Sequence, residues 1–211
     1  MTSRTIAGVD HLVFAAPDLE TGMDFIEEKL GVRPVRGGRH ASFGTHNALL
    51  SLGPSTYLEV IAPDPGTERP VRGRLFGLDD IGAPEMRTWA VRREDLLTAL
   101  ATAGASGIGP IEAGRRERSD GTVLSWRLTD PYAMPFDGAV PFVISWGDTP
   151  HPATTAPSGG ELAGLAIVHP NAEAVRKALA LLDALVDVGE GDAFELVARI
   201  RTPEGATVEV R

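Results

Sequence analysis

One order of predicted elements, a strand followed by a helix and then three strands, recurs along the chain of 211 residues. The segment 6–16 is rich in Val, Leu and Phe and is ended by Pro17, which is typical of a strand before a turn. Asp18 is a good helix N-cap, and apolar residues at three- and four-residue steps up to Leu30, before Gly31, predict an amphipathic helix. The three strands predicted to follow it cover residues 39–43, 45–52 and 57–62.

The same order of elements is found twice more. Residues 86–92 and 95–103 predict a second strand and helix, and Ser119-Asp120-Gly121 predicts a hairpin between two of the strands that follow. Residues 162–168 predict a third opening strand, after which Asn171 is the N-cap of a third helix. Such internal repetition is typical of folds built from similar units.

We therefore predict an α+β fold of three βαβββ modules, whose curved mixed sheets surround a small-molecule cavity. A single module has only one sheet face to bury, so it must pair with another module. An odd number of modules leaves one face without cover, which predicts a homodimer unless the third module packs within the chain. The predicted modules span residues 1–66, 84–147 and 160–211, and the predicted linkers span 67–83, as a polar surface excursion, and 148–159.

Composition excludes several classes of function. The chain has no cysteine, so thiolate metal sites, disulfides and a cysteine nucleophile are ruled out. Its net charge of −9 opposes binding to nucleic acid or to an anionic membrane surface, and the one basic cluster, 115–118, is interrupted by Glu117 and is interpreted as a solvated strand face. No apolar run approaches the length of a membrane span and residues 1–10 contain no signal-peptide core, so we expect a cytoplasmic protein.

Short motifs spread over most of the chain resemble one known family. They are Gly8-Val9-Asp10-His11-Leu12-Val13 with Pro17-Asp18-Leu19, Gly37-Gly38-Arg39-His40, Gly44-Thr45-His46-Asn47-Ala48-Leu49, Tyr57-Leu58-Glu59-Val60-Ile61-Ala62-Pro63, and Pro141-Phe142-Val143-Ile144-Ser145-Trp146-Gly147 with His151-Pro152. Together they resemble the glyoxalase-like branch of the glyoxalase/bleomycin-resistance/dioxygenase, or vicinal oxygen chelate, superfamily. The resemblance implies paired βαβββ units curled around a cavity, here one glyoxalase-like domain plus an extra module.

The resemblance also implies a divalent metal ion, held by His or Gln on the first strand of a module and by Glu on its last strand. His11 and Glu59 match these two positions in the first module. The matching positions elsewhere lie near Arg87 and Ser145 in the second module and at Gly164 and Glu209 in the third. Glycine has no side chain that can ligate, so the family's set of four ligands is incomplete in this chain.

Strand geometry brings three of these polar residues together. If the turn after Leu52 pairs that residue with Tyr57, then His46 points to the same side of the sheet as Glu59, and His11 shares that concave face. A cluster of His11, His46 and Glu59 can bind a divalent metal and polarise a carbonyl oxygen, or transfer protons without a metal.

Five further side chains are candidates for ligand binding. Arg39 and His40 follow a glycine pair that can present them to an anionic group, Trp146 can serve as a stacking platform, and His151 lies in a Pro-rich segment that can close over the cavity. Asn47 completes the set. The structural alternatives are an ordinary glycine loop, a core tryptophan, an exposed loop histidine, and a local turn hydrogen-bonded by Asn47 and the preceding histidine.

Two functions are compatible with these residues. The first is a metal-assisted lyase or isomerase that acts on a carbonyl compound, with His11 and Glu59 as metal ligands or as an acid/base pair. The second is a protein that sequesters an apolar or aromatic ligand without turnover, as bleomycin-resistance relatives do, and the glycine at position 164 favours it. In a purely structural alternative, His11 is a core histidine satisfied by Glu59 or by backbone, and an arginine neutralises the acid.

Overall fold

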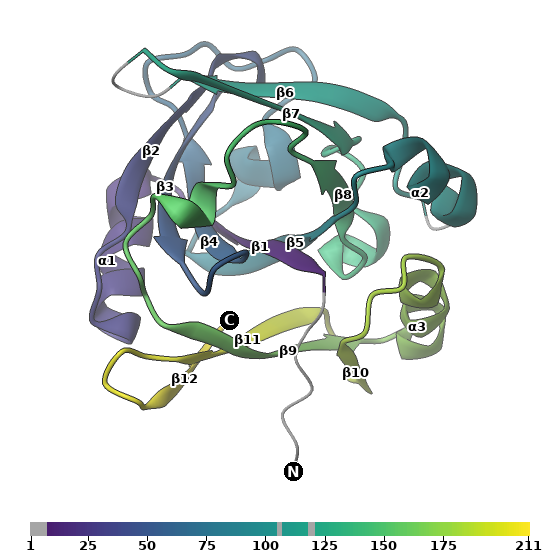
Figure 1. Ribbon diagram of the computed structural model, residues 1–211. Helices are drawn as coiled ribbons and strands as arrows, with labels where there is room; N and C mark the ends of the chain where they lie inside the picture. Colours follow the sequence, from purple (N-terminus) through teal and green to yellow (C-terminus); the bar gives the residue numbers. More distant parts are fainter. Residues whose placement is uncertain (1–7, 105–106, 118–120) are drawn as a thin grey trace.

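The fold is a closed barrel of eight strands with a separate four-stranded sheet beneath it (Figure 1). A computed structural model describes residues 8–104, 107–117 and 121–211. The first half of the barrel consists of β1 (Val9–Ala15), α1 (Leu19–Leu30), β2 (Val35–His40), β3 (Thr45–Ser51) and β4 (Tyr57–Pro63). The second half consists of β5 (Glu85–Arg92), α2 (Leu96–Ala103), β6 (Ile111–Glu117), β7 (Val123–Thr129) and β8 (Phe142–Ser145).

The two halves repeat one pairing scheme, which confirms the paired βαβββ architecture. In each half the first strand lies parallel to the last one, so β1 pairs with β4 and β5 with β8. The halves then join through an antiparallel β1–β5 ladder and through a single pair between β2 and β6, Arg39 with Glu117. The barrel order is β1-β4-β3-β2-β6-β7-β8-β5. The hairpin predicted at Ser119-Asp120-Gly121 has its first two residues outside the described part of the chain, but β6 and β7 do pair antiparallel.

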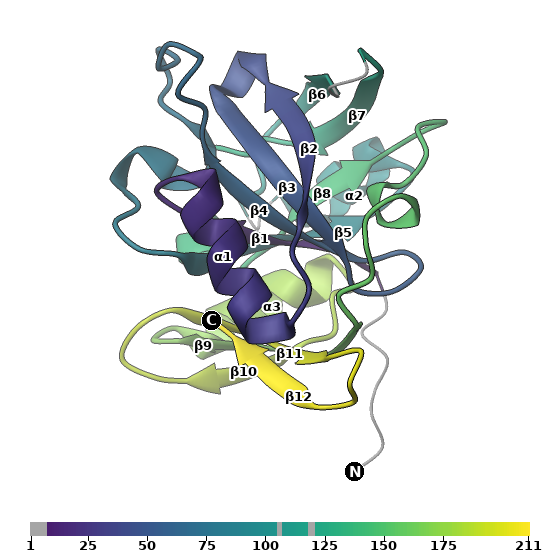
Figure 2. The ribbon, with the colours of Figure 1, turned by 90° about the vertical axis from the view of Figure 1, so that its left-hand side faces the viewer.

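Helix α1 forms where its sequence predicts it. The backbone N–H of Thr21 donates to the Asp18 carboxylate over 2.9 Å, and Gly31 ends the helix in the left-handed region at φ 74°. The buried face of α1 packs on the outside of the barrel (Figure 2) together with Leu12 and Phe14 of β1. Strand alternation then turns His11 into the barrel interior, as predicted.

The third unit has the predicted order of elements but different strand pairing. It consists of β9 (Glu161–His169), α3 (Ala172–Leu181), β10 (Asp187–Glu190), β11 (Glu195–Arg201) and β12 (Thr207–Val210). Its sheet order is β10-β9-β11-β12, so β9 pairs with β10 and β11 and not with β12, the last strand of its own unit. The prediction of a third copy of the module is therefore not confirmed, because element order alone does not determine which strands pair.

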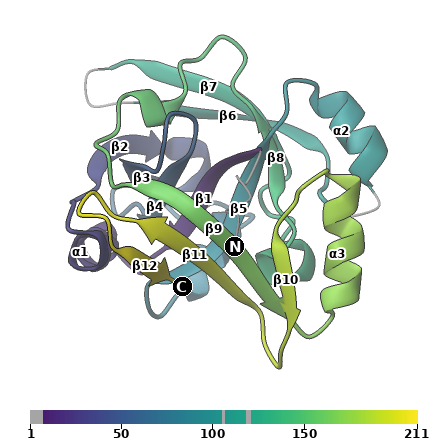
Figure 3. The same ribbon diagram turned by 60° about the horizontal axis from the view of Figure 1, so that its bottom comes forward.

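The inner face of this second sheet is covered by the barrel (Figure 3). Leu165, Ile167 and Ile200 belong to one apolar cluster with Trp89 and Val91 on the outside of the barrel. The homodimer prediction thus loses the reason on which it was based, since the third unit buries its own sheet within the chain. In the described part of the chain, no helix combines the length and the apolar character that crossing a membrane requires.

Two segments behave differently from their sequence-based predictions. The stretch 67–83 was expected to be a polar surface excursion, yet Leu75, Phe76 and Leu78 from it are buried in the barrel's interior cluster. The glycine pair at 37–38 does not form the loop that is one interpretation of it, but lies within β2 at an irregularity of the β2–β3 ladder. A Cβ at Gly37 would collide with the side chain of Asn47, so the close approach of strand and amide requires glycine there.

Candidate functional site

The barrel encloses a cavity of about 30 Å³, enough for roughly one or two water molecules. Its walls are aromatic and aliphatic side chains from both halves of the barrel. Five polar residues interrupt these walls, namely His11, His40, Asn47, Glu59 and Arg116. A small, largely apolar cavity with a few convergent polar groups is the usual form of a small-molecule site.

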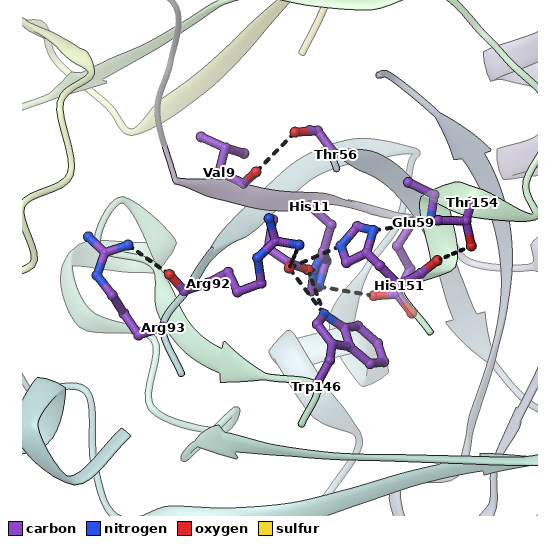
Figure 4. A network of polar contacts seen from close by, with 11 residues as sticks. Val9, His11, Thr56, Glu59, Arg92, Arg93, Trp146, His151 and Thr154 are labelled. Carbon is purple, nitrogen blue, oxygen red and sulfur yellow. Dashed lines mark hydrogen bonds and ion pairs between the residues drawn. The ribbon is translucent and has the colours of Figure 1, made fainter. Parts of the chain in front are cut away.

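Asp10 organises one end of the cavity. The ladder between β1 and β5 shifts register between Val9 and His11, and this irregularity allows Asp10 and His11 to meet although they are neighbours on one strand. The Asp10 carboxylate is fully buried and accepts hydrogen bonds from His11 Nδ1 at 2.7 Å, Trp146 Nε1 at 3.1 Å and His151 Nε2 at 3.1 Å (Figure 4). Burial by itself raises the pKa of Asp10, but the hydrogen bonds and charges of the two histidines outweigh it and hold the pKa well below its usual range.

His11 is oriented by this carboxylate. Because a carboxylate only accepts, the His11 proton is assigned to Nδ1, and Nε2 is the nitrogen that faces Glu59, with 3.7 Å between Nε2 and Oε2. The imidazole stacks on the ring of Tyr57 at 4.6 Å and is 3% exposed. Burial, together with the charges of Glu59 and Asp10, raises the pKa of the Tyr57 hydroxyl well above 10, so that the hydroxyl keeps its proton.

Asn47, and not His46, is the partner that β3 supplies to this cluster. The predicted hairpin register was wrong by one residue, since Tyr57 pairs with Ser51 and Glu59 with Leu49. A slip of one residue reverses every side chain of a strand, so His46 lies on the outer face and Asn47 on the inner one. Asn47 Nδ2 donates to Glu59 Oε1 at 2.5 Å.

The orientation of this amide is fixed by its other contacts. Asn47 Oδ1 accepts from the backbone N–H of Gly38 at 3.1 Å and from Arg116 Nη1 at 3.2 Å. Its NH₂ group must therefore face Glu59. A continuous polar path thus runs from Arg116 through Asn47, Glu59 and His11 to Asp10.

The remaining polar lining comes from β2 and β6. His40 is buried, lies 2.9 Å from the Thr45 hydroxyl through Nδ1, and has its pKa lowered to about 4, mainly by burial. It is therefore neutral at physiological pH. Arg116 is also buried, at 3% exposure, which corrects the interpretation of 115–118 as a wholly solvated face, residue 118 lying outside the described residues.

His151 and Trp146 close the end of the cavity at which Asp10 lies. The backbone N–H of Ala153 donates to His151 Nδ1 at 3.3 Å, which leaves the proton on Nε2 for Asp10. The His151 ring also meets Tyr57 and Trp146 edge to face. Arg39, by contrast, lies outside the cavity, where its Nε donates to Asp64 at 2.6 Å.

Sequence reasoning missed Asp10 and Arg116. Asp10 carried one recognisable signal, since it is an acidic residue inside an otherwise apolar strand and directly precedes His11. Arg116 carried none, because the burial of one residue in a run of charged ones depends on which strand lies beside it.

The donor set does not fit the metal site that the family resemblance implies. The pairing places Ala90 opposite His11 in the second half, and Phe142 and Ile144 line the cavity from β8. The predicted counterparts near Arg87 and Ser145 do not line it. Within residues 8–104, 107–117 and 121–211, no three His, Asp or Glu side chains are grouped so that they could hold a metal ion. His11 and Glu59 alone, with the Arg116 cation in the same cavity, make a poor cation site.

We expect that divalent metal ions do not stabilise this protein. A ligand present at one hundred times its Kd adds about 2.7 kcal/mol to the free energy of unfolding, which a melting curve detects easily. Melting temperatures measured with millimolar Mg²⁺, Mn²⁺, Ni²⁺ or Zn²⁺ should equal those measured with EDTA. A rise of several degrees with one ion, abolished by Glu59→Gln, would contradict the expectation.

Comparison with known proteins agrees with the architecture. The model of a family described as "Glyoxalase-like domain" matches residues 9–182. A hypothetical protein from Staphylococcus aureus has a similar fold, with a TM-score of 0.65 and 12% sequence identity over 96% of this chain and 98% of that one. Methylmalonyl-CoA epimerase from Mycobacterium tuberculosis aligns less well, with a TM-score of 0.40 and 18% identity over 68% and 89% of the two chains. No curated protein matches in sequence. Because the family model spans both halves of the barrel, the chain belongs to the family of glyoxalase-like domain proteins.

Proposed function

We propose that this protein binds a small carbonyl compound in the barrel and moves a proton on it, as a lyase or isomerase that needs no metal ion. The proposal rests on the array of Asp10, His11 and Glu59 in the largely apolar cavity of the barrel, with 2.7 Å between Asp10 and His11 and 3.7 Å between His11 and Glu59. Two titratable groups that face one small space are what removal and return of a proton require.

Each member of the array has a distinct task. Asp10 is a positioning residue, since it holds the Nδ1 proton of His11 and so presents Nε2 to the cavity. Asn47 ties down Oε1 of Glu59, which leaves Oε2 directed toward His11 and the cavity. His11 Nε2 carries a lone pair while Asp10 holds the proton on Nδ1, so Nε2 can take the proton next to the carbonyl group of a bound compound and then return it. The Glu59 carboxylate faces the imidazolium that forms between these two steps.

Ligand sequestration without turnover is the second candidate. It is favoured by the cavity wall from the second half, where Ala90, Phe142 and Ile144 offer no polar group. In that case, the polar array would only orient a ligand.

The test follows deuterium incorporation from D₂O next to the carbonyl of small 2-oxoaldehydes and 2-hydroxyketones, measured by proton NMR. Glu59→Gln and His11→Gln should each slow the exchange by about 100-fold or more. His169→Gln is the matched control, because His169 is equally buried but lies on β9, outside the cavity. Binding of these compounds with no exchange above the uncatalysed rate would reject proton transfer and favour sequestration.

A further inference from the structure

A second, larger pocket adjoins the cavity on the outer side of β6 and β7. Its volume is about 520 Å³, against about 30 Å³ inside the barrel. The pocket arises where the barrel wall is short of pairing, because β7 pairs with β8 only at Arg127 with Ser145 and Leu128 with Ile144. The rest of β7 stands away from β8, and the Thr149 hydroxyl donates to the Ser125 carbonyl across the gap.

Two tryptophans are shared by the pocket and the cavity. Trp126 and Trp146 line both spaces, with ring centroids 5.4 Å apart and planes tilted by 48°. Trp146 is held in place by its hydrogen bond to Asp10, whereas Trp126 is half-buried. The Trp126 indole lies directly over Gly114, where a Cβ would collide with it. This contact provides a flat aromatic surface between the two spaces.

Two arginines that have no hydrogen-bond or ion-pair partner among the described residues border the outer pocket. Arg115 lies opposite Ser125 and Arg127 opposite Ala113, so the two arginines are diagonal neighbours on the outer face of the hairpin. Every other arginine in the described residues forms an ion pair or donates a hydrogen bond. Asp148 also lines this pocket but pairs with neither arginine. Two adjacent guanidinium groups in a chain of net charge −9 repel one another unless an anion lies between them.

From these observations we infer that the outer pocket binds the anionic end of an elongated substrate, held by Arg115 and Arg127, while a planar part stacks on Trp126 and the carbonyl end enters the barrel. The assignment of the carbonyl end rests on the proposed function. The volumes support the division, because the cavity accepts only a few atoms and the remainder of any larger ligand must lie outside. Arginine binds phosphate and carboxylate oxygens through paired N–H donors, so a phosphate or carboxylate is the expected anion.

The probe for this site is 1-naphthyl phosphate, with 1-naphthol as its uncharged counterpart. Titration of the full chain, followed by tryptophan fluorescence at low ionic strength, should show saturable binding of the phosphate that weakens with added salt. The double variant Arg115→Gln/Arg127→Gln should bind it at least tenfold more weakly and should bind naphthol as the native chain does. Arg201→Gln is the matched control, since Arg201 is exposed but paired with Glu161.

The outcomes separate this inference from the proposed function. Equal affinity of the native chain and the double variant for naphthyl phosphate, or an equal loss in Arg201→Gln, would overturn the anion site. Glu59→Gln should leave naphthyl phosphate binding unchanged, because Glu59 lies in the cavity and not in the outer pocket. The absence of deuterium exchange therefore would not argue against the anion site. Binding of naphthyl phosphate through Arg115 and Arg127 would support that site even if the protein catalysed no reaction.

Discussion

Replacing Asp10 by Asn is expected to lower the free energy of unfolding at pH 7 by about 3–5 kcal/mol, the usual cost of removing one partner from a buried charged cluster. Three donors, from His11, Trp146 and His151, converge on this carboxylate. An amide offers one acceptor oxygen, and its NH₂ group would face at least one of those donors. Urea denaturation of the native and Asp10→Asn chains measures the difference.

The same carboxylate predicts how stability depends on pH. The pKa of Asp10 is lowered in the folded chain, so its contribution is fully present above the unfolded pKa of about 3.9 and is lost as the pH falls below that value toward the folded pKa. The difference between native and Asp10→Asn should therefore shrink as the pH falls below about 4.

Asp18→Asn is the control for this pH dependence. The pKa of Asp18 is also lowered, mainly by its hydrogen bonds with Thr21, but Asp18 is exposed and Asn is an equally good N-cap. Its replacement should change stability little. Two results would contradict the role assigned to the Asp10 cluster. One is a comparable loss of unfolding free energy in Asp18→Asn, and the other is a difference between the native and Asp10→Asn chains that does not shrink in acid.

Replacing Asn47 by Leu is expected to destabilise the fold by about 3–5 kcal/mol, although the two side chains are similar in size. With leucine there, the Glu59 carboxylate would lose a hydrogen-bond donor and the Gly38 N–H would lose its acceptor. Arg116 would lose one contact as well. Each buried polar group that loses its partner costs about 1–3 kcal/mol. The measurement is again the free energy of unfolding in urea.

The neighbouring residue supplies the control for Asn47. His46 is half-buried on the outer face of β3 and has no hydrogen bond or ion pair to the described residues, so His46→Leu should change stability by no more than about 0.5 kcal/mol. The pair therefore also tests the register of β3. If His46→Leu were the costly variant, the register with Tyr57 opposite Leu52 would be the correct one.

Local sequence patterns determined most of the secondary structure. Asp18 and Gly31 bound a helix because capping needs only groups a few residues away, and the strands of the first two units follow from apolar runs between turn residues. His11 was assigned to the interior for the same reason, because alternation along one strand is a local property. The motifs Gly8–Val13 and Tyr57–Pro63, which resemble those of glyoxalase-like proteins, were sufficient to predict the family.

The tertiary structure decided everything that depends on pairing between strands. The register of β3 against β4 places Asn47 in the site, where His46 was predicted. The pairing of β9 with β10 and β11 gives the third unit a strand order that differs from that of the first two units. The fold also buried Arg116, and it left Arg115 beside the outer pocket with no partner among the described residues. It brought Asp10 to Trp146, which lies 136 residues away along the chain. The sequence determined by itself which residues are apolar, which are charged and where helices and turns begin. Which of them meet is set by long-range packing and register, where a shift of one residue costs little locally but exchanges the interior and exterior of a strand.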